Sequence, residues 1–422
     1  MKVLMGEVIS LNRDDHWVHF PDGAICWDNE VIVDIGLRSE VVARYTDATI
    51  IDKSGCLILP GFIDCHLHFP QYEIMGSYGE ELLGWLNKYT FPEEISFNQQ
   101  DKAEKVARNL INNMLSNGTT CGVFFSSSSY KATQVLFKNL ATLGLRGVVG
   151  KVAMDRFSPE ELIVLPEDEY TQTKQLISEF HNKEGRLTYA LTPRFAPTCT
   201  EALLEVTQKL RAEFPDLLLQ THYAENKAEI EWVQELFPQH KSYLEVYNHY
   251  DLLGDKTLLA HCIHVEDEDL KLLQKTKSKV VHCPTSNLFL GSGLFPYERF
   301  DEYSIDVGFG SDIGAGTKLS IWSNLLSAYE IQKMRGKSLS PKELFKLATL
   351  DSAKILGMQN KIGALEEGMQ VDLQIIDPKK HKLLNDRFTR ELSVEEKVFS
   401  LISLCDDRAT DSVVVAGEFV CY

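Results

Sequence analysis

The sequence lacks any apolar run that approaches the roughly 18 residues of a membrane-spanning helix. Its opening residues, MKVLMGE, also lack the apolar core of a signal peptide, so we expect neither a membrane protein nor a secreted one. Positive charge is scarce, because 43 Lys and Arg face 61 Asp and Glu and the net charge is −18. Because the sequence has no basic patch to neutralise phosphates, we do not expect a nucleic-acid partner.

Three further patterns are missing. The cysteines number nine and are scattered, which fits reduced thiols in the cytoplasm better than a disulfide framework. No G-x-G-x-x-G follows a first strand, which disfavours an open dinucleotide-binding sheet. Internal repeats and low-complexity segments are absent as well. What remains is a globular protein of 422 residues, enough for one large domain and a smaller one.

The most informative string is PGFIDCHLH at residues 60–68, which places His66 and His68 at the end of an apolar run typical of a strand. Side chains at i and i+2 of a strand share a face, so both imidazoles can reach one point. His222, His261 and Asp312 each come just after a further apolar run. Together these residues could supply nitrogen and carboxylate ligands to one divalent ion, with a water completing the shell. The pattern predicts a metallohydrolase.

Apolar runs typical of strands buried on both faces alternate with helical patterns through the middle of the chain. The predicted strands span residues 61–69, 119–125, 145–154, 187–192, 217–222, 257–261, 280–283 and 305–310. The predicted helices among them span residues 98–117, 133–143, 201–214 and 266–276. This alternation predicts an α/β fold, a (β/α)8 TIM-like barrel. In such a barrel the active residues lie at the C-terminal ends of the strands, where every candidate ligand falls.

The two ends of the chain differ from its middle. Residues 1–59 and 362–422 contain short alternating runs, and neither segment could bury a core alone. We therefore expect them to pair as a small discontinuous β-sandwich beside a barrel at 60–361. Residues 338–356 are predicted to form a pair of helices, beginning with Ser340 as the N-cap and a proline at the first helical position.

Longer strings carry a family resemblance. They are PGFIDCHLHFPQY at 60–72, GWLNKYTFPEE at 84–94, LTPRFAPTCT at 191–200, THYAEN at 221–226, AHCIHV at 260–265, HCPTSNLFLGSG at 282–293 and GFGSDIGAGTKLSIW at 308–322. Their order along the whole chain resembles that of the amidohydrolase superfamily, and within it the guanine deaminases. The resemblance implies hydrolytic deamination of a purine substrate, guanine, to xanthine and ammonia by a cytoplasmic homodimer.

The resemblance also implies the metal. It assigns one zinc ion to His66, His68, His222 and Asp312, with iron as the alternative because imidazole ligands suit both. Binuclear relatives bridge two metals with a carboxylated lysine at the end of the fourth strand. The fourth predicted strand, residues 187–192, contains no lysine, which favours a single ion.

Three residues are candidates for proton transfer. Asp312 can take a proton from the attacking water while it remains a ligand, and His261 can orient that water. Glu225, three residues after His222, is placed to carry a proton to the ring nitrogen beside the attacked carbon, and the alternative is a helix-capping carboxylate. The same combination of glutamate and zinc operates in base deaminases of an unrelated fold.

Four residues are candidates for substrate binding. Gln71 offers both a donor and an acceptor to a purine edge and matches the family's substrate-binding glutamine. Arg194 matches the arginine expected to donate to the guanine carbonyl oxygen, and the alternative is a salt bridge across a strand end. Phe195 is expected to pack near the ring. Trp85 either lines the pocket or belongs to the core.

The chain departs from the family pattern at two places. Phe69 stands where alanine is common, and Tyr223-Ala224 replaces an aliphatic residue followed by serine. We expect both changes close to the ring, where they would alter the shape of the pocket. The departures leave other aminated heterocycles open as substrates, among them pterin, cytosine, thioadenosine and aminotriazine.

Overall fold

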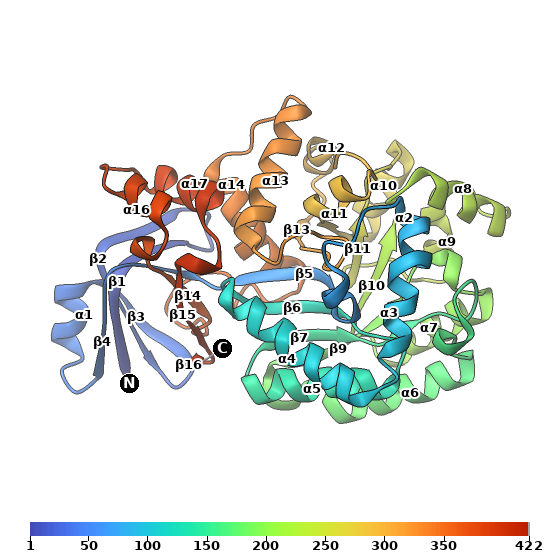
Figure 1. The fold of residues 1–422 in the computed structure, drawn as a ribbon, viewed down its shortest axis with the longest axis horizontal. Helices are drawn as coiled ribbons and strands as arrows, with labels where there is room; N and C mark the ends of the chain where they lie inside the picture. Colours follow the sequence, from blue (N-terminus) through green and yellow to red (C-terminus); the bar gives the residue numbers. More distant parts are fainter. Residues whose placement is uncertain (421–422) are drawn as a thin grey trace.

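The computed structural model describes residues 1–420, and a parallel barrel forms its centre (Figure 1). In sheet order the strands are β13 (Val307–Phe309), β12 (Lys279–His282), β11 (Thr257–His261), β10 (Leu218–Tyr223), β9 (Leu187–Pro193), β7 (Arg146–Gly150), β6 (Thr119–Phe125) and β5 (Phe62–His68), with β8 (Val152–Ala153) beside β9. The Asp312 N–H donates to the His66 carbonyl at 2.8 Å and the His68 N–H to the Ile313 carbonyl at 2.6 Å, which joins the two ends of the sheet. The predicted barrel is confirmed.

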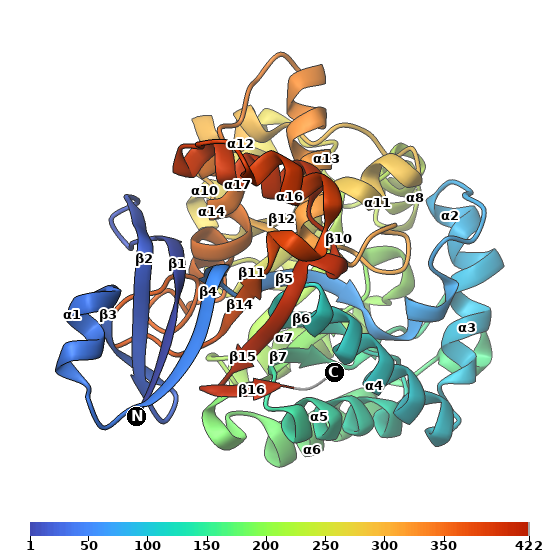
Figure 2. The same cartoon turned by 60° about the vertical axis from the view of Figure 1, so that its left-hand side comes forward.

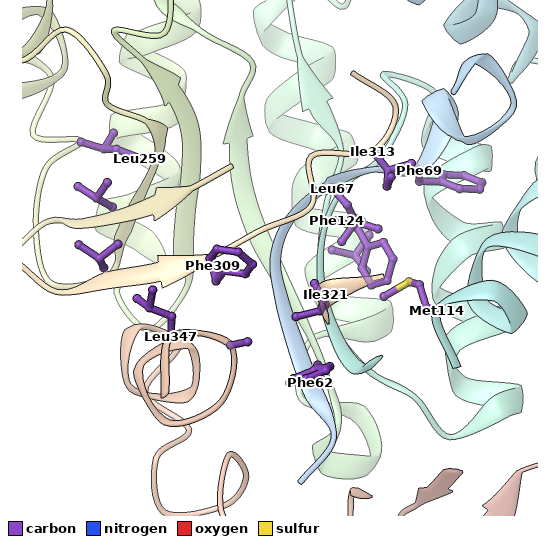
Figure 3. Packing of buried hydrophobic residues seen from close by; sticks show 14 of the residues in the cluster. Phe62, Leu67, Phe69, Met114, Phe124, Leu259, Phe309, Ile313, Ile321 and Leu347 are labelled. Atoms are coloured by element: carbon purple, nitrogen blue, oxygen red, sulfur yellow. The ribbon is translucent and has the colours of Figure 1, made fainter. Parts of the chain in front are cut away.

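Helices surround the barrel on its outside (Figure 1). They are α2 (Leu82–Trp85), α3 (Phe91–Ser96), α4 (Gln100–Ser116), α5 (Tyr130–Leu143), α6 (Pro166–Phe180), α7 (Glu201–Glu213), α8 (Lys227–Leu236), α9 (Tyr243–His249), α10 (Asp267–Thr276), α11 (Pro284–Phe289), α12 (Tyr297–Glu302) and α13 (Ile321–Met334). Helix α4 buries Val106, Leu110 and Met114, which recur at helical spacing on one face. Figure 3 shows Met114 beside Phe124 of β6. Within residues 1–420, no helix combines the length and the apolar character needed to cross a bilayer.

The barrel interior is a packed core at one end and polar at the other. A buried apolar cluster draws residues from seven of the barrel strands, among them Ile63, Val123, Val148 and Leu258, and is closed by Ile355. Layers of side chains of this kind fill a barrel and leave no pore. The polar candidate residues therefore gather at the opposite, C-terminal ends of the strands.

The two ends of the chain form a second sheet. In order its strands are β16 (Glu418–Val420), β15 (Thr410–Val415), β14 (Leu373–Ile376), β4 (Thr49–Pro60), β1 (Lys2–Leu11), β2 (Trp17–Asp28) and β3 (Val31–Leu37). Figure 2 shows β14 and β15 from the tail next to β4 from the N-terminal segment. The predicted association of the two ends is confirmed. The exact limits at residues 59/60 and 361/362 stay a prediction, and residues 421–422 of the tail lie outside the described residues.

Further helices pack beside this sheet and under the barrel. They are α1 (Arg38–Arg44), α16 (Lys382–Phe388), α17 (Val394–Leu404), α14 (Pro341–Lys346) and α15 (Ser352–Ile355). Ser340 accepts a hydrogen bond from the Glu343 N–H, which confirms it as an N-cap. The predicted pair of helices is present as α14 and α15, and a π-helical turn at Leu347–Asp351 joins them into one continuous helical segment. The sequence there contains neither glycine nor a second proline to interrupt the helix.

Candidate active site

Five polar side chains from four strand ends meet at one point of the barrel. His66 and His68 end β5, His222 lies near the end of β10, and His261 is the last residue of β11. Asp312 follows β13 after three residues. His66, His68, His261 and Asp312 are buried, and His222 is of intermediate exposure. Because parallel strands present their carboxyl ends at the same face of a barrel, residues far apart in sequence come together here.

The distances between these groups are short. The Nε2 atoms of His66 and His68 lie 3.2 and 3.3 Å from Oδ1 of Asp312. The Nε2 atoms of His68 and His222 are 3.1 Å apart. Nε2 of His261 lies 3.7 Å from Oδ2 of Asp312. Four imidazoles therefore turn a ring nitrogen toward one carboxylate.

The backbone is strained where two of these residues stand. His261 has φ 72° and Asp312 has φ 53°, both in the left-handed region that residues other than glycine seldom adopt. Such conformations cost of order 1–3 kcal/mol and persist only where the surrounding structure imposes them. Ala224, two residues after His222, also has a positive φ. The strand ends are thus bent sharply at the polar cluster. Strained backbone of this kind is concentrated at functional sites in proteins.

Two of the histidine rings are held in orientation by contacts to Nδ1, the nitrogen that faces away from the cluster. Nδ1 of His222 lies 2.7 Å from the carbonyl oxygen of Arg194, and Nδ1 of His261 lies 2.9 Å from Oδ1 of Asn287. Because each of these partners accepts a hydrogen bond, each ring carries its proton on Nδ1. The lone pair on Nε2 is therefore free to face the cluster, as it must be in a metal ligand.

The cluster fits a divalent metal ion. His66, His222, His261 and Asp312 each offer one ligand atom, and these four atoms lie within 4.8 Å of one another. In the described part of the chain, Nε2 of His66 and Nε2 of His261 are buried without a hydrogen-bond partner. Imidazole nitrogens together with a carboxylate oxygen are a common donor set for zinc and iron. His68 points at the same place and offers a fifth donor.

Burial sets the protonation states that such an ion needs. It lowers the pKa of His68 to about 3 and the pKa of His222 well below its ordinary value. Burial would raise the pKa of Asp312, but the neighbouring His66 outweighs it, together with His68 and His261, and the pKa lies well below the usual value. Neutral imidazoles and an ionised carboxylate are the forms that bind metals.

A cavity of about 420 Å³ opens beside the cluster. His68, His222, His261 and Asp312 form one wall, and Glu225 and Glu229 lie next to them. The other lining residues include the four predicted substrate-binding residues, Gln71, Trp85, Arg194 and Phe195. Its lining combines apolar and aromatic side chains with a few polar groups, which is the character of a pocket for a small ligand.

Glu225 occupies the position between the cluster and the cavity. Its Oε2 lies 3.5 Å from Nε2 of His261, and its Oε1 accepts a hydrogen bond of 3.0 Å from the Ser292 hydroxyl. Burial, reinforced by the charge of Asp312, raises the pKa of Glu225 to about 8, and the Ser292 hydrogen bond opposes this rise. The cap of α8 is made by Asn226 with Glu229, so the alternative role of Glu225 as a helix cap is wrong.

The sequence did not single out two residues of this site, Glu94 and Ser292. Glu94 binds Arg194 and Gln71 from behind, and Ser292 holds Glu225. Glu94 closes the string at 84–94, but nothing in the pattern separates it from its neighbour Glu93. Ser292 stands in a Gly-Ser-Gly loop that reads as an ordinary turn.

Two expectations about the pocket are wrong. Phe69 packs edge-on against Phe97, with ring centroids 5.0 Å apart, and does not line the cavity. Tyr223 packs against Tyr243 instead. Strand neighbours point to opposite faces, so Tyr223 must face away from the side to which His222 points. The residues at which the chain departs from the family pattern therefore do not line the cavity.

Comparisons with known proteins identify a family, a curated relative and a solved structure that the chain resembles. Residues 57–420 match the model of the amidohydrolase family. The chain is 42% identical to the guanine deaminase of Escherichia coli K12 over 87% of its own length and 84% of the relative's. The solved structure of E. coli guanine deaminase superposes with a TM-score of 0.97 and 37% identity, covering 100% of this chain and 99% of that one.

A second solved structure is similar over its full length. Guanine deaminase from C. acetobutylicum, with bound guanine in its active site, superposes with a TM-score of 0.92 and 32% identity and covers 100% of both chains. The match to the family model extends over most of the sequence, and the barrel, the terminal sheet and the histidine–aspartate cluster agree with it. The chain belongs to the amidohydrolase family.

Proposed function

We propose that this protein hydrolyses guanine to xanthine and ammonia, with one zinc ion at the histidine–aspartate cluster. One observation carries the proposal. A single cavity brings Gln71 and Arg194, which can bind a purine edge, within reach of the cluster and of the buried acid Glu225. The similarity to guanine deaminases, one of them with guanine bound, supports the same substrate.

The ligands of the ion are assigned to His66, His68, His222 and Asp312, with His261 beside them. Strand β9, with the sequence LTYALTP, offers no lysine that could bridge a second metal, which supports one ion per chain. Iron is the alternative, since imidazole accepts either metal. Bound zinc would lower the pKa of a water molecule to about 7 and so supply the nucleophile at neutral pH.

The protein's own residues move the protons. Water adds to C2 of guanine, and the carboxylate of Asp312, which is ionised, accepts a proton from that water. Glu225, whose pKa of about 8 keeps it protonated at neutral pH, gives a proton to N3 of the ring. The bond from C2 to the amino nitrogen then breaks, and that nitrogen takes the proton from Asp312 and leaves as ammonia. The hydroxyl on C2 returns a proton to Glu225 and becomes the carbonyl of xanthine. His261 keeps the water in line for attack.

The substrate is recognised by the cavity wall that lies opposite the histidine–aspartate cluster. Arg194 donates to the carbonyl oxygen O6, and Gln71 binds the neighbouring ring edge. Phe195 and Trp85 supply aromatic surfaces for a flat ring. Trp85 lines the cavity and also belongs to a buried apolar cluster.

The test measures metal and turnover on the same preparation. We expect about one zinc per chain by mass spectrometry, and loss of the ultraviolet absorbance of guanine with equimolar ammonia release. Pterin, cytosine, thioadenosine and an aminotriazine serve as competitors and should be at least about 100-fold poorer in kcat/KM. A metal-loaded protein that deaminates one of these rings in preference to guanine would replace the substrate while keeping the reaction.

We also propose that the protein works as a homodimer in the cytoplasm, as the family resemblance implies. The eight cysteines within residues 1–420 are all buried and unpaired, which suits a reducing compartment. Light scattering on the purified protein should give twice the 47.8 kDa chain mass. A monomer mass across the micromolar range would contradict the dimer.

A further inference from the structure

A buried carboxylate without an assigned role lies behind the substrate wall. Glu94 sits on α3 with 1% of its surface exposed. Its Oε1 and Oε2 each accept a hydrogen bond of 2.9 Å from the same guanidinium nitrogen, Nη1 of Arg194. Arg194 is itself 2% exposed. A buried ion pair of this kind costs desolvation energy, so its presence is weak evidence for a stabilising role.

The ion pair fixes the direction of the arginine. Glu94 holds one end of the guanidinium plane, and the ring of Phe91 lies under it with the guanidinium carbon 5.5 Å from the ring centroid. The guanidinium is planar and its donors point in fixed directions. With Nη1 bound to Glu94, the donors on Nε and Nη2 are the ones left for a ligand in the cavity that Arg194 lines.

Glu94 also fixes the amide of Gln71. The Gln71 Nε2 donates to Oε1 of Glu94 at 3.4 Å. An ionised carboxylate can only accept hydrogen bonds, so it selects the orientation that turns the amide NH2 toward it. The carbonyl oxygen of Gln71 is then the atom presented on the other side. The cavity wall therefore offers a donor from Arg194 beside an acceptor from Gln71.

We propose that Glu94 is a positioning residue that makes the site selective for rings with a lactam edge, a carbonyl next to a ring N–H. The carbonyl of such a ring accepts from Arg194, and its N–H donates to Gln71. Guanine and hypoxanthine have this edge, whereas 2-aminopurine has the same amino group as guanine but neither the carbonyl nor the N–H. The inference rests on the proposed function and adds the chemical feature by which the substrate is selected.

The experiment compares binding of two purines that separate these features. Hypoxanthine has no amino group to lose, so its Kd is measured by calorimetry on the metal-loaded protein without turnover. 2-Aminopurine keeps the amino group, so its Kd is measured by its fluorescence directly after rapid mixing, before turnover. The variants are Glu94→Gln, which removes the charge, and Glu94→Asp, which keeps it. Glu93→Gln is the matched control, because Glu93 on the same helix pairs with Lys102 at 2.7 Å instead.

The native protein should bind hypoxanthine at least about 30-fold more tightly than 2-aminopurine, because two buried hydrogen bonds are at stake. Glu94→Gln should weaken the binding of hypoxanthine by about 30-fold, because the amide of the new side chain can donate to Gln71 and turn the Gln71 amide around. The binding of 2-aminopurine should weaken by less than about threefold. Glu94→Asp should stay within about fivefold of the native value, and Glu93→Gln should match it. For guanine, KM should rise with kcat nearly unchanged.

Two results would overturn the role of Glu94. One is equal affinity of the native protein for the two purines, which requires no variant to fold. The other is a Glu94→Gln protein, with native metal content, that loses affinity for both purines alike. If guanine is not deaminated while hypoxanthine still binds selectively, the proposed reaction fails and the positioning role stands, so the two failures are distinguishable.

Discussion

At the scale of single residues, Glu225 combines three features that a proton carrier needs. It is buried, its carboxyl lies 3.5 Å from His261, and its pKa is raised to about 8 by burial and by Asp312. Efficient proton transfer requires a pKa close to the working pH. The environment of this carboxyl therefore suits an acid that gives and recovers a proton near neutrality.

Glu225→Gln should keep its metal and lose most of its activity, by about 1000-fold in kcat, because the amide cannot carry the proton. Metal content and guanine turnover are measured together. His222→Ala is the contrasting variant and should lose both metal and activity. Substantial turnover by Glu225→Gln would remove this residue from proton transfer, and native metal content in His222→Ala would show that His222 is not a ligand.

Ser292→Ala should move the pH dependence of activity upward. The protonated form of Glu225 is present below its pKa of about 8, so kcat/KM should fall as pH rises through that value. The Ser292 hydroxyl favours the ionised form, so its removal raises the pKa and shifts the alkaline limb up by about 0.5 to 1 pH unit. The check is to measure kcat/KM of the native protein and of Ser292→Ala from about pH 6 to about pH 10.

A control for this variant stands on α11, just before the loop that holds Ser292. The hydroxyl of Ser286 is buried and, within residues 1–420, has no hydrogen-bond partner. Ser286→Ala should leave the profile in place. A limb that moves to lower pH in Ser292→Ala, or that moves equally in both variants, would contradict the role given to Ser292.

The individual metal-site residues could be predicted from the sequence because each stands in a recognisable local pattern. His66 and His68 alternate on one strand, and the remaining three each follow an apolar run. Glu94 was not accessible, because its bond to Arg194 spans 100 positions and depends on how α3 lies over the barrel. Phe69 was misplaced because the chain turns into a 3-10 helix, Phe69–Ile74, directly after β5.

At the scale of elements, a side-chain clamp adds to the backbone hydrogen bonds that close the barrel. Asp64 of β5 accepts hydrogen bonds from the N–H of Ser311 at 2.9 Å and from its hydroxyl at 2.5 Å. Ser311 directly precedes Asp312, so the clamp holds the last strand end against the first. Both residues are buried. The position of Asp312 beside His66 and His68 follows from this contact.

Asp64→Ala should lower the free energy of unfolding by about 3 kcal/mol, because two buried donors lose a charged acceptor. Urea denaturation of the metal-free protein measures the change. Asp306→Ala is the control, since Asp306 pairs with the exposed Lys354 near the same strand and should cost less than about 1 kcal/mol. Equal midpoints for the two variants would show that the clamp does not hold the barrel closed.

The sequence predicted the strands better than their connections. Strands β6 and β11 have the predicted limits, because each is a short apolar run with both faces buried. The π-helical turn between α14 and α15 could not be foreseen, because no proline or glycine marks it. Local patterns specify where elements form, whereas their continuity depends on packing that only the fold supplies.

At the scale of the whole molecule, a buried charge cluster joins the barrel to the terminal sheet. Asp372, directly before β14, accepts a hydrogen bond from Nη2 of Arg186 at 2.6 Å. Nε of Arg146, at the start of β7, lies 3.7 Å from the other carboxylate oxygen. Asp372 also accepts the N–H of Ala416 at 2.9 Å. One carboxylate thus connects two barrel strands to the tail.

Asp372→Ala should destabilise the protein by about 3 to 5 kcal/mol, because two buried guanidinium groups lose their shared anion. Thermal and urea unfolding measure the loss, and separate melting of the barrel and the sheet would reveal lost coupling between them. Glu30→Gln tests a solvent-exposed partner of Arg186 and should cost less than about 1 kcal/mol. A small effect of Asp372→Ala would show that the apolar contacts alone hold the two bodies together.

The barrel and the pairing of the two ends could both be foreseen, but the cluster between them could not. Arg146, Arg186 and Asp372 stand in unremarkable surroundings in the sequence. Their proximity arises only when strands from the middle of the chain meet a segment from its tail. Long-range electrostatic contacts of this kind carry no local periodicity.

The spread of the ion-binding groups along the chain has a consequence during synthesis. His66 and His68 leave the ribosome early, yet Asp312, the only carboxylate among them, follows after most of the barrel has been made. A nascent or proteolytically shortened chain that stops before Asp312 presents histidines without a complete set of donors. The complete set of donors therefore forms only after translation has passed this point and the last strand has docked on the first.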